Sequence, residues 1–184
     1  MQSRRDALLS FAAVWGALSL PAGTAAAGAQ PAVTVGANPG WTPTGVSPSQ
    51  AQVLDALSEL IAPGTDTPGT REAGVPAYVD RTIAGYCTAV EAGEFRSVLD
   101  ALDADARARH GKGFAALSTS EQTAIAATYD KGQKFSPFGR LKEVVLVGYF
   151  SSEPGATLAV RYDPIPGDYK GCIPLSEVGR AWAL

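Results

Sequence analysis

Two segments of the chain carry a helix start signal followed by apolar residues at helical spacing. Ser47-Pro48-Ser49-Gln50 places a hydroxyl at the cap, proline at the first helical position and glutamine three residues after the cap. Ser118-Thr119-Ser120-Glu121 is a second capping box, with glutamate three residues after the cap. Such capping boxes satisfy N–H groups that a helix start leaves without partners. The sequence therefore predicts a mainly α chain of about five helices.

The apolar spacing predicts where the helices run. A first helix is expected from Pro48 to Pro63-Gly64, where two breakers end it. A third helix is expected to end at His110-Gly111, since a basic residue followed by glycine is typical of a helix end. A second helix is expected to begin near Pro76 and to place Cys87 on its buried face. Its apolar stripe comprises Val79, Ile83, Tyr86, Cys87 and Val90.

The segments outside these helices are rich in turn formers. Residues 30–46 are proline- and glycine-rich and predict an extended linker or arm, on which Trp41 would either insert into a partner's groove or dock on its own domain. The run from Leu141 to Phe150 is ambiguous, because β-branched and aromatic residues favour a strand while a buried helix would look the same. Residues 151–184 predict a turn-rich C-terminal wrap.

The N-terminus carries an export signal. Arg4 and Arg5 precede an uncharged, alanine-rich and moderately apolar stretch that ends in small residues suited to signal peptidase. An arginine pair before a mildly apolar core is typical of a twin-arginine signal, although Ala7 stands where a bulky apolar residue is preferred. An ordinary secretory signal and a membrane anchor are the alternatives. The expected organisation is a signal peptide at 1–29, an arm at 30–46 and a helical domain at 47–184.

Charge and cysteine content limit the classes of partner. The formal net charge is −3, so the chain offers no basic surface for phosphate backbones or anionic lipids. After residue 30, no apolar run reaches the roughly 20 residues of a membrane span. Cys87 and Cys172 form an even pair, which suggests one disulfide in an oxidising compartment. Two buried free thiols and a bond to another chain are the alternatives.

Few residue types suited to catalysis are present. His110 is the single histidine, and its place at a helix end favours a capping role over that of a base. One histidine and two distant cysteines cannot form a His/Cys metal site. The glycines at 64, 69 and 74 lack the spacing of a nucleotide-binding turn. The sequence therefore predicts no catalytic, cofactor-binding or metal-binding residue, and the acidic cluster is interpreted as a solvated helix face: Asp100, Asp103 and Asp105.

Three stretches together resemble one known family. They are residues 60–69 (LIAPGTDTPG), 148–156 (GYFSSEPGA) and 162–175 (YDPIPGDYKGCIPL). Over about residues 50 to 175 the chain is similar to the small subunit of gluconate 2-dehydrogenase, called subunit 3 or gamma. The third stretch is long and unusual in composition, which makes it the most specific of the three.

The resemblance implies a fold, partners and a location. The fold would be mainly helical, which favours a buried helix at 141–150. The partner would be a large FAD flavoprotein of the glucose–methanol–choline type that oxidises a sugar or sugar acid, such as gluconate at C2 or a glycoside at C3. Electrons commonly pass to a cytochrome c, so the haem c would belong to a third subunit and neither cofactor to this chain. The family's small subunit often carries the large one to the periplasm by twin-arginine export, and a cytochrome subunit would add membrane association.

A small chain with aromatic, proline-rich ends is suited to wrapping a larger partner. Rigid aromatic side chains contribute most at such interfaces. Alternatively, Tyr149 and Phe150 fill the core of the chain's own fold instead of contacting a partner. A second function class also stays open: a stand-alone periplasmic enzyme or binding protein with a pocket in the helical core. The candidate interface residues are Trp41, Tyr149, Phe150, Tyr162, Tyr169 and Trp182.

Overall fold

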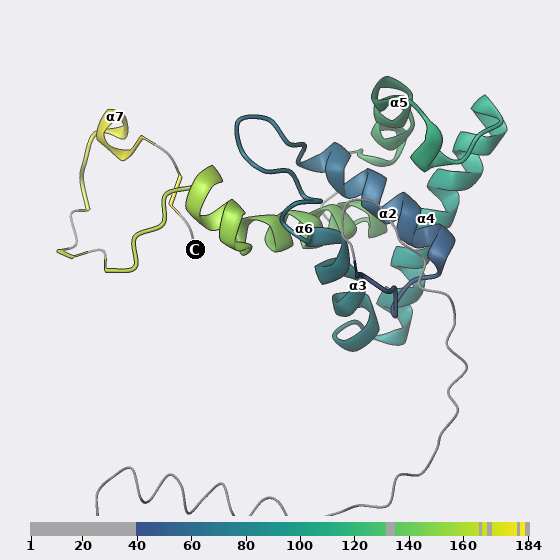
Figure 1. Cartoon of the computed structure of the whole chain (residues 1–184), viewed down its shortest axis with the longest axis horizontal. Helices are drawn as coiled ribbons and strands as arrows, with labels where there is room; N and C mark the ends of the chain where they lie inside the picture. Colours follow the sequence, from purple (N-terminus) through teal and green to yellow (C-terminus); the bar gives the residue numbers. More distant parts are fainter. Residues whose placement is uncertain (1–39, 132–134, 166, 169–170, 180, 183–184) are drawn as a thin grey trace, which may run out of the picture. The chain divides into compact units, whose positions relative to one another are not determined.

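The computed structural model describes residues 40–131, 135–165, 167–168, 171–179 and 181–182. Over these residues the chain is mainly helical, which confirms the predicted fold class (Figure 1). The described part contains no strand, only a single parallel β-bridge between Arg161 and Trp182. In chain order the elements are α2 (Pro48–Ile61), α3 (Val75–Gly85), α4 (Ala89–His110), η2 (Phe114–Ala116), α5 (Thr119–Tyr129), α6 (Pro137–Phe150), η3 (Gly155–Ala159) and α7 (Leu175–Val178).

Helix α2 lies at the centre of the helical bundle. Its predicted capping box is present: Ser47 accepts a hydrogen bond from the Gln50 backbone N–H, and the Gln50 side chain accepts one from the Ser47 N–H. Helices α3, α4, α5 and α6 and the turn η2 all contact α2. Its middle is consequently buried nearly all round, including Ala51, Val53, Leu54, Ala56 and Leu57.

The predicted C-terminal end of the second helix is wrong. Helix α3 stops at Gly85, and Tyr86 and Val90 are exposed instead of buried. Thr88 starts α4 with a capping box of its own, in which Glu91 accepts from the Thr88 N–H and Thr88 accepts from the Glu91 N–H. This Thr-x-x-Glu box was in the sequence, but the apolar spacing continued across it. Cys87 therefore lies in the turn between two helices and is only half-buried.

The remaining predicted helix signals are confirmed. Helix α4 ends at His110, and Gly111 follows with φ 68°, the left-handed conformation that glycine adopts without strain. The Ser118 capping box starts α5. The ambiguous run up to Phe150 is helical as α6, which begins behind the Ser136 N-cap.

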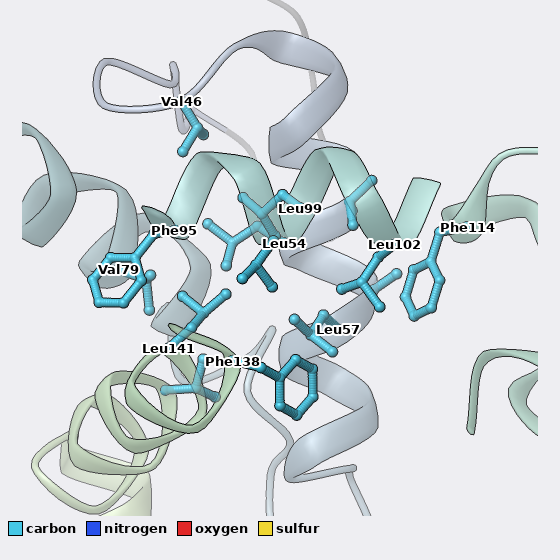
Figure 2. Close-up of a cluster of buried hydrophobic side chains, with 14 of the residues drawn as sticks. Val46, Leu54, Leu57, Val79, Phe95, Leu99, Leu102, Phe114, Phe138 and Leu141 are labelled. Atoms are coloured by element: carbon cyan, nitrogen blue, oxygen red, sulfur yellow. The ribbon is translucent and has the colours of Figure 1, made fainter. Parts of the chain in front are cut away.

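Leucines and phenylalanines from four elements form the core. Figure 2 shows the side chains of α2, α4 and α6 pointing toward one another, with the Phe114 ring of η2 beside Leu102. Full burial of one such side chain stabilises a fold by about 1.5–3 kcal/mol. The central members, all nearly inaccessible to solvent, are Leu54, Leu57, Leu99, Leu102, Phe114, Phe138 and Leu141.

Candidate functional site

A surface hollow of about 350 Å³ lies between α3, the start of α4 and α6. Tyr86 stands at its edge with 86% of its surface exposed, and Val147 of α6 is half-exposed on the wall. Half of the lining residues are aromatic or aliphatic, and three are charged. We call this surface the α3–α6 hollow; its lining residues are Tyr78, Thr82, Tyr86, Cys87, Glu91, Phe95, Arg140, Glu143, Val144 and Val147.

A close helix contact forms one wall of the hollow. A Cβ atom at Gly148 of α6 would lie 2.6 Å from Cδ1 of Tyr78 on α3, so only glycine lets the helix backbone approach this ring. The Arg140 guanidinium lies 5.7 Å from the centroid of the Phe95 ring. It also forms ion pairs with Glu91, at 3.3 Å, and with Glu94. Aromatic packing and ion pairs thus shape the hollow before any partner binds.

Cys87 contributes a thiol, the strongest nucleophile type among the lining residues. Burial raises the pKa of its thiol, and the negative charge of Glu91 raises that pKa further, against weaker opposing effects of Arg140 and Arg96. A raised pKa keeps the thiol protonated at neutral pH, and the thiolate is the reactive form. The hollow is therefore better suited to holding an apolar group than to nucleophilic chemistry.

The second structured site is centred on Asp80, which α3 buries to 1% exposure. Its Oδ1 accepts hydrogen bonds from the backbone N–H groups of Gly45 (2.8 Å) and Val46 (3.0 Å). Its Oδ2 accepts from the Thr44 N–H (2.9 Å), the Thr44 hydroxyl (3.2 Å) and Nε1 of Trp41 (3.2 Å). One carboxylate therefore holds the whole segment 41–46 against the bundle.

The Asp80 contacts decide between the two alternatives for Trp41. Its ring is partly buried against the bundle's own core, so it docks on its own domain. The backbone carbonyl of Gly45 also accepts from Nε of Arg96 at 2.8 Å. A Cβ at Gly45 would lie 2.4 Å from the Asp80 carbonyl oxygen, which explains why glycine stands there. The folded part thus includes residues 41–46, which were expected in the arm.

The third structured site is the loop between α2 and α3, which Glu59 organises. Glu59 Oε1 accepts from the Gly64 N–H at 3.0 Å, and Oε2 accepts from the Thr70 hydroxyl and the Arg71 N–H, both at 3.1 Å. Nε of Arg71 in turn donates to Asp55 at 2.9 Å. Hydrogen bonds to Glu59 therefore attach the loop with the sequence GTDTPG to helix α2.

Glu59 makes the fold acid-sensitive. Burial alone would raise its pKa, but the N–H groups of Gly64 and Arg71 and the Thr70 hydroxyl outweigh burial and lower the pKa below its usual 4.5. The folded state therefore binds fewer protons, so this stabilisation is complete above pH 4.5 and lost as the pH falls through the folded pKa. Burial raises the pKa of Asp55. Protonation of Asp55 therefore favours the folded state as the pH falls, against the effect of Glu59.

We expect Glu59→Gln to lower the urea midpoint of unfolding at neutral pH. As the pH is lowered from about 6 to about 3, the midpoint of this variant should then fall less than that of the wild type. Glu72→Gln, which changes an exposed carboxylate of the same loop, should follow the wild type. Denaturant unfolding across this pH range measures both. An acid loss as large in Glu59→Gln as in the wild type would show that Glu59 does not carry the effect.

The predicted interface aromatics divide between core and surface. Tyr149 is buried, and its hydroxyl donates to the Pro68 carbonyl at 2.8 Å, so it supports the loop. The Phe150 ring meets the Tyr149 ring edge-on and remains 45% exposed. Tyr162 is 58% exposed, and Trp182 lies under the Arg161 guanidinium at 4.2 Å. Tyr169, like the arginine pair of the signal, lies outside the described residues.

Both cysteines are free thiols in the structure, Cys87 half-buried and Cys172 exposed. The Cys87–Cys172 disulfide stays a prediction for the exported protein. By the chain-entropy model a bond over this loop would stabilise the fold by up to about 4.5 kcal/mol. We expect the unfolded, unreduced protein from the periplasm to show no reactive thiol in a titration. Two reactive thiols per chain would rule the bond out.

The remaining candidate residues take part in local contacts. Nδ1 of His110 lies 3.2 Å from Glu121, at the meeting of α4 and α5. Asp103 accepts from the Phe114 N–H and Asp105 from the Tyr129 hydroxyl, so this acidic row also supports the packing. Among the described residues no group of three or more His, Cys, Asp or Glu could hold a metal ion. No helix in that part of the chain is long and apolar enough to cross a membrane.

The residues most exposed at the hollow were missed by sequence reasoning. Tyr86 and Val90 were assigned to a buried stripe, and Val147 to a helix buried all round. The capping box at Thr88 could have shown that Tyr86 lies between two helices. A helix that begins behind Thr88 leaves the residues just before it in a connecting segment.

A comparison with family models gives a match. The model of gluconate 2-dehydrogenase subunit 3 matches residues 48–167. The chain belongs to this family. Searches of curated proteins and of solved structures found no match. As a member of the subunit 3 family, the chain is a subunit of a dehydrogenase complex, which implies a larger partner subunit. The matched range contains the α3–α6 hollow, Asp80 and the Glu59 loop.

Proposed function

We propose that the chain is the non-catalytic small subunit of a periplasmic FAD-dependent dehydrogenase of a sugar or sugar acid. It stabilises the large flavoprotein subunit and carries it across the membrane by twin-arginine export. The observation that carries this proposal is the match to gluconate 2-dehydrogenase subunit 3 over residues 48–167. A gluconate 2-dehydrogenase or a glycoside 3-dehydrogenase is the expected complex, with a cytochrome c subunit as electron acceptor.

The local chemistry favours placing the flavin in the large subunit. Dinucleotide sites use a strand, a glycine-rich turn and a helix whose N-terminus faces the pyrophosphate. The described part of this chain has no strand, and Gly64 and Gly69 lie in a loop held by Glu59. These residues do not fit a dinucleotide, and the thiol in the hollow is a poor nucleophile. A structural and carrier role fits this chain better than catalysis.

The test is purification of the small chain by itself. We expect no flavin absorbance and no dye-linked sugar oxidation from the isolated chain, since the residues that the structure describes do not form a dinucleotide site. Co-expression with the large flavoprotein should give both. The matched control is the large subunit expressed without the small one, whose yield of flavin-loaded protein should fall. Bound flavin in the isolated small chain at nearly one per chain would contradict the proposal.

A further inference from the structure

Two exposed apolar side chains line the α3–α6 hollow, and two more lie within three residues of a lining residue in the sequence. Tyr86 and Val147 line it, Val90 lies in the first turn of α4, and Phe150 lies one turn beyond Val147 on α6. All four are exposed by 45% or more. Tyrosines and phenylalanines on a surface contribute more to interfaces than most residue types. The fold leaves these side chains available for a partner.

The bundle does not need Tyr86 for its own packing. Tyr86 caps the C-terminus of α3 through its backbone N–H, which donates to the Thr82 carbonyl at 2.9 Å. Within the described part of the chain its hydroxyl makes no hydrogen bond. Burying this ring against a partner would therefore gain apolar area without breaking an internal contact.

The rim of the hollow is acidic. Arg140 is shared by Glu91 and Glu94, so these two carboxylates have one positive charge between them. Glu143 also lines the hollow and has no ion pair among the described residues. The lining itself therefore contains two carboxylates, Glu91 and Glu143, and one guanidinium, Arg140, so its formal charge is negative. An occupant that carries an arginine or lysine beside an apolar side chain would match this charge.

We propose that the large flavoprotein subunit docks on the α3–α6 hollow, inserting an apolar side chain between Tyr86 and Val147 and placing a basic residue beside Glu143. This inference rests on the proposed function, which supplies the partner. It assigns the contact to the hollow and not to the C-terminal segment, whose Tyr162 is also exposed.

Cys87 provides a direct readout of occupancy. It lines the hollow and is half-buried, so a maleimide can reach it in the free chain. With Cys172→Ser in place, Cys87 is the only thiol of the chain. We expect maleimide labelling of Cys87 to be at least tenfold slower in the purified complex than in the free full-length mature chain. Equal labelling rates, fast or slow, would overturn the docking site; equally slow labelling would indicate that the chain's own C-terminal segment covers the hollow.

Substitutions test the same site by affinity. Tyr86→Ala should weaken binding of the large subunit about 10- to 100-fold, as expected for a central interface tyrosine. Glu143→Lys should slow association and Glu72→Lys should not, since Glu72 lies on the loop after α2. Tyr162→Ala is the matched aromatic control and should bind like the wild type. Circular-dichroism melting of each free variant separates loss of binding from loss of folding.

The outcomes distinguish the docking site from the function. A complex that forms with wild-type affinity for Tyr86→Ala, but is weakened by Tyr162→Ala, would overturn the docking site and leave the proposed function standing. If no flavoprotein binds the wild-type chain at all, the proposed function fails, and the docking site fails with it.

Discussion

Replacing Arg4 and Arg5 by lysine is expected to leave both this chain and the proposed large flavoprotein subunit in the cytoplasm. The twin-arginine route recognises the arginine pair and transports proteins that have already folded. A flavoprotein must fold around its FAD before export, and the proposed complex carries its signal on the small chain. We therefore expect a near-complete loss of flavin-dependent sugar oxidation from the periplasm, with the activity retained inside the cell.

Fractionation followed by dye-linked activity measures this result. The matched control replaces Arg107 and Arg109 by lysine, because both are exposed on α4 and form surface ion pairs within the helix. Such pairs contribute little to stability. Export of the control should equal that of the wild type. If the flavoprotein still reaches the periplasm with the lysine pair at positions 4 and 5, the carrier role is wrong.

The second large effect concerns Asp80→Asn, which we expect to lower the free energy of unfolding by about 3 kcal/mol or more. Each carboxylate oxygen accepts at least two hydrogen bonds, and the group is 1% exposed. An amide must place its NH₂ where one of these oxygens stood, facing N–H donors that then lose their acceptor. For a domain of this size the melting temperature should fall by roughly 10 °C.

Thermal melting measured by circular dichroism tests the Asp80 substitution. Asp66→Asn changes an exposed carboxylate in the loop after α2 and should leave the melting temperature unchanged. Released from Asp80, Trp41 should also become more exposed. In a chain without residues 1–29 and with Trp182→Phe, Trp41 is the remaining tryptophan, and its fluorescence should shift to longer wavelength. A melting temperature within about 2 °C of the wild type would show that segment 41–46 is not held by this carboxylate.

The elements that the sequence predicted correctly are those whose signals are local. A capping box at Ser47 or Ser118 acts within four residues, and glycine after His110 allows a left-handed turn at that position. The helix over Leu141 to Phe150 was different, because a residue pattern that is apolar on all sides does not distinguish a strand from a buried helix. The family resemblance favoured the helix, and the structure confirms it.

The contacts that form the sites were beyond prediction because they join distant positions. Asp80 accepts from residues 34 to 39 positions earlier, and no local pattern marks a lone aspartate on an apolar helix as an acceptor for an N-terminal segment. The hollow likewise depends on α3 and α6 lying against each other, which the Gly148–Tyr78 contact allows. Tyr86 was assigned to the core because the apolar spacing continued beyond the end of α3.

Purification of the small chain from periplasmic extract by an affinity tag at its C-terminus tests directly whether the proposed complex exists. We expect a large flavoprotein to co-elute in equal amount. The eluate should have an oxidised-flavin absorbance spectrum, and adding a sugar or sugar acid should bleach this spectrum. A small chain that elutes alone and colourless, from cells that contain the active dehydrogenase, would contradict it.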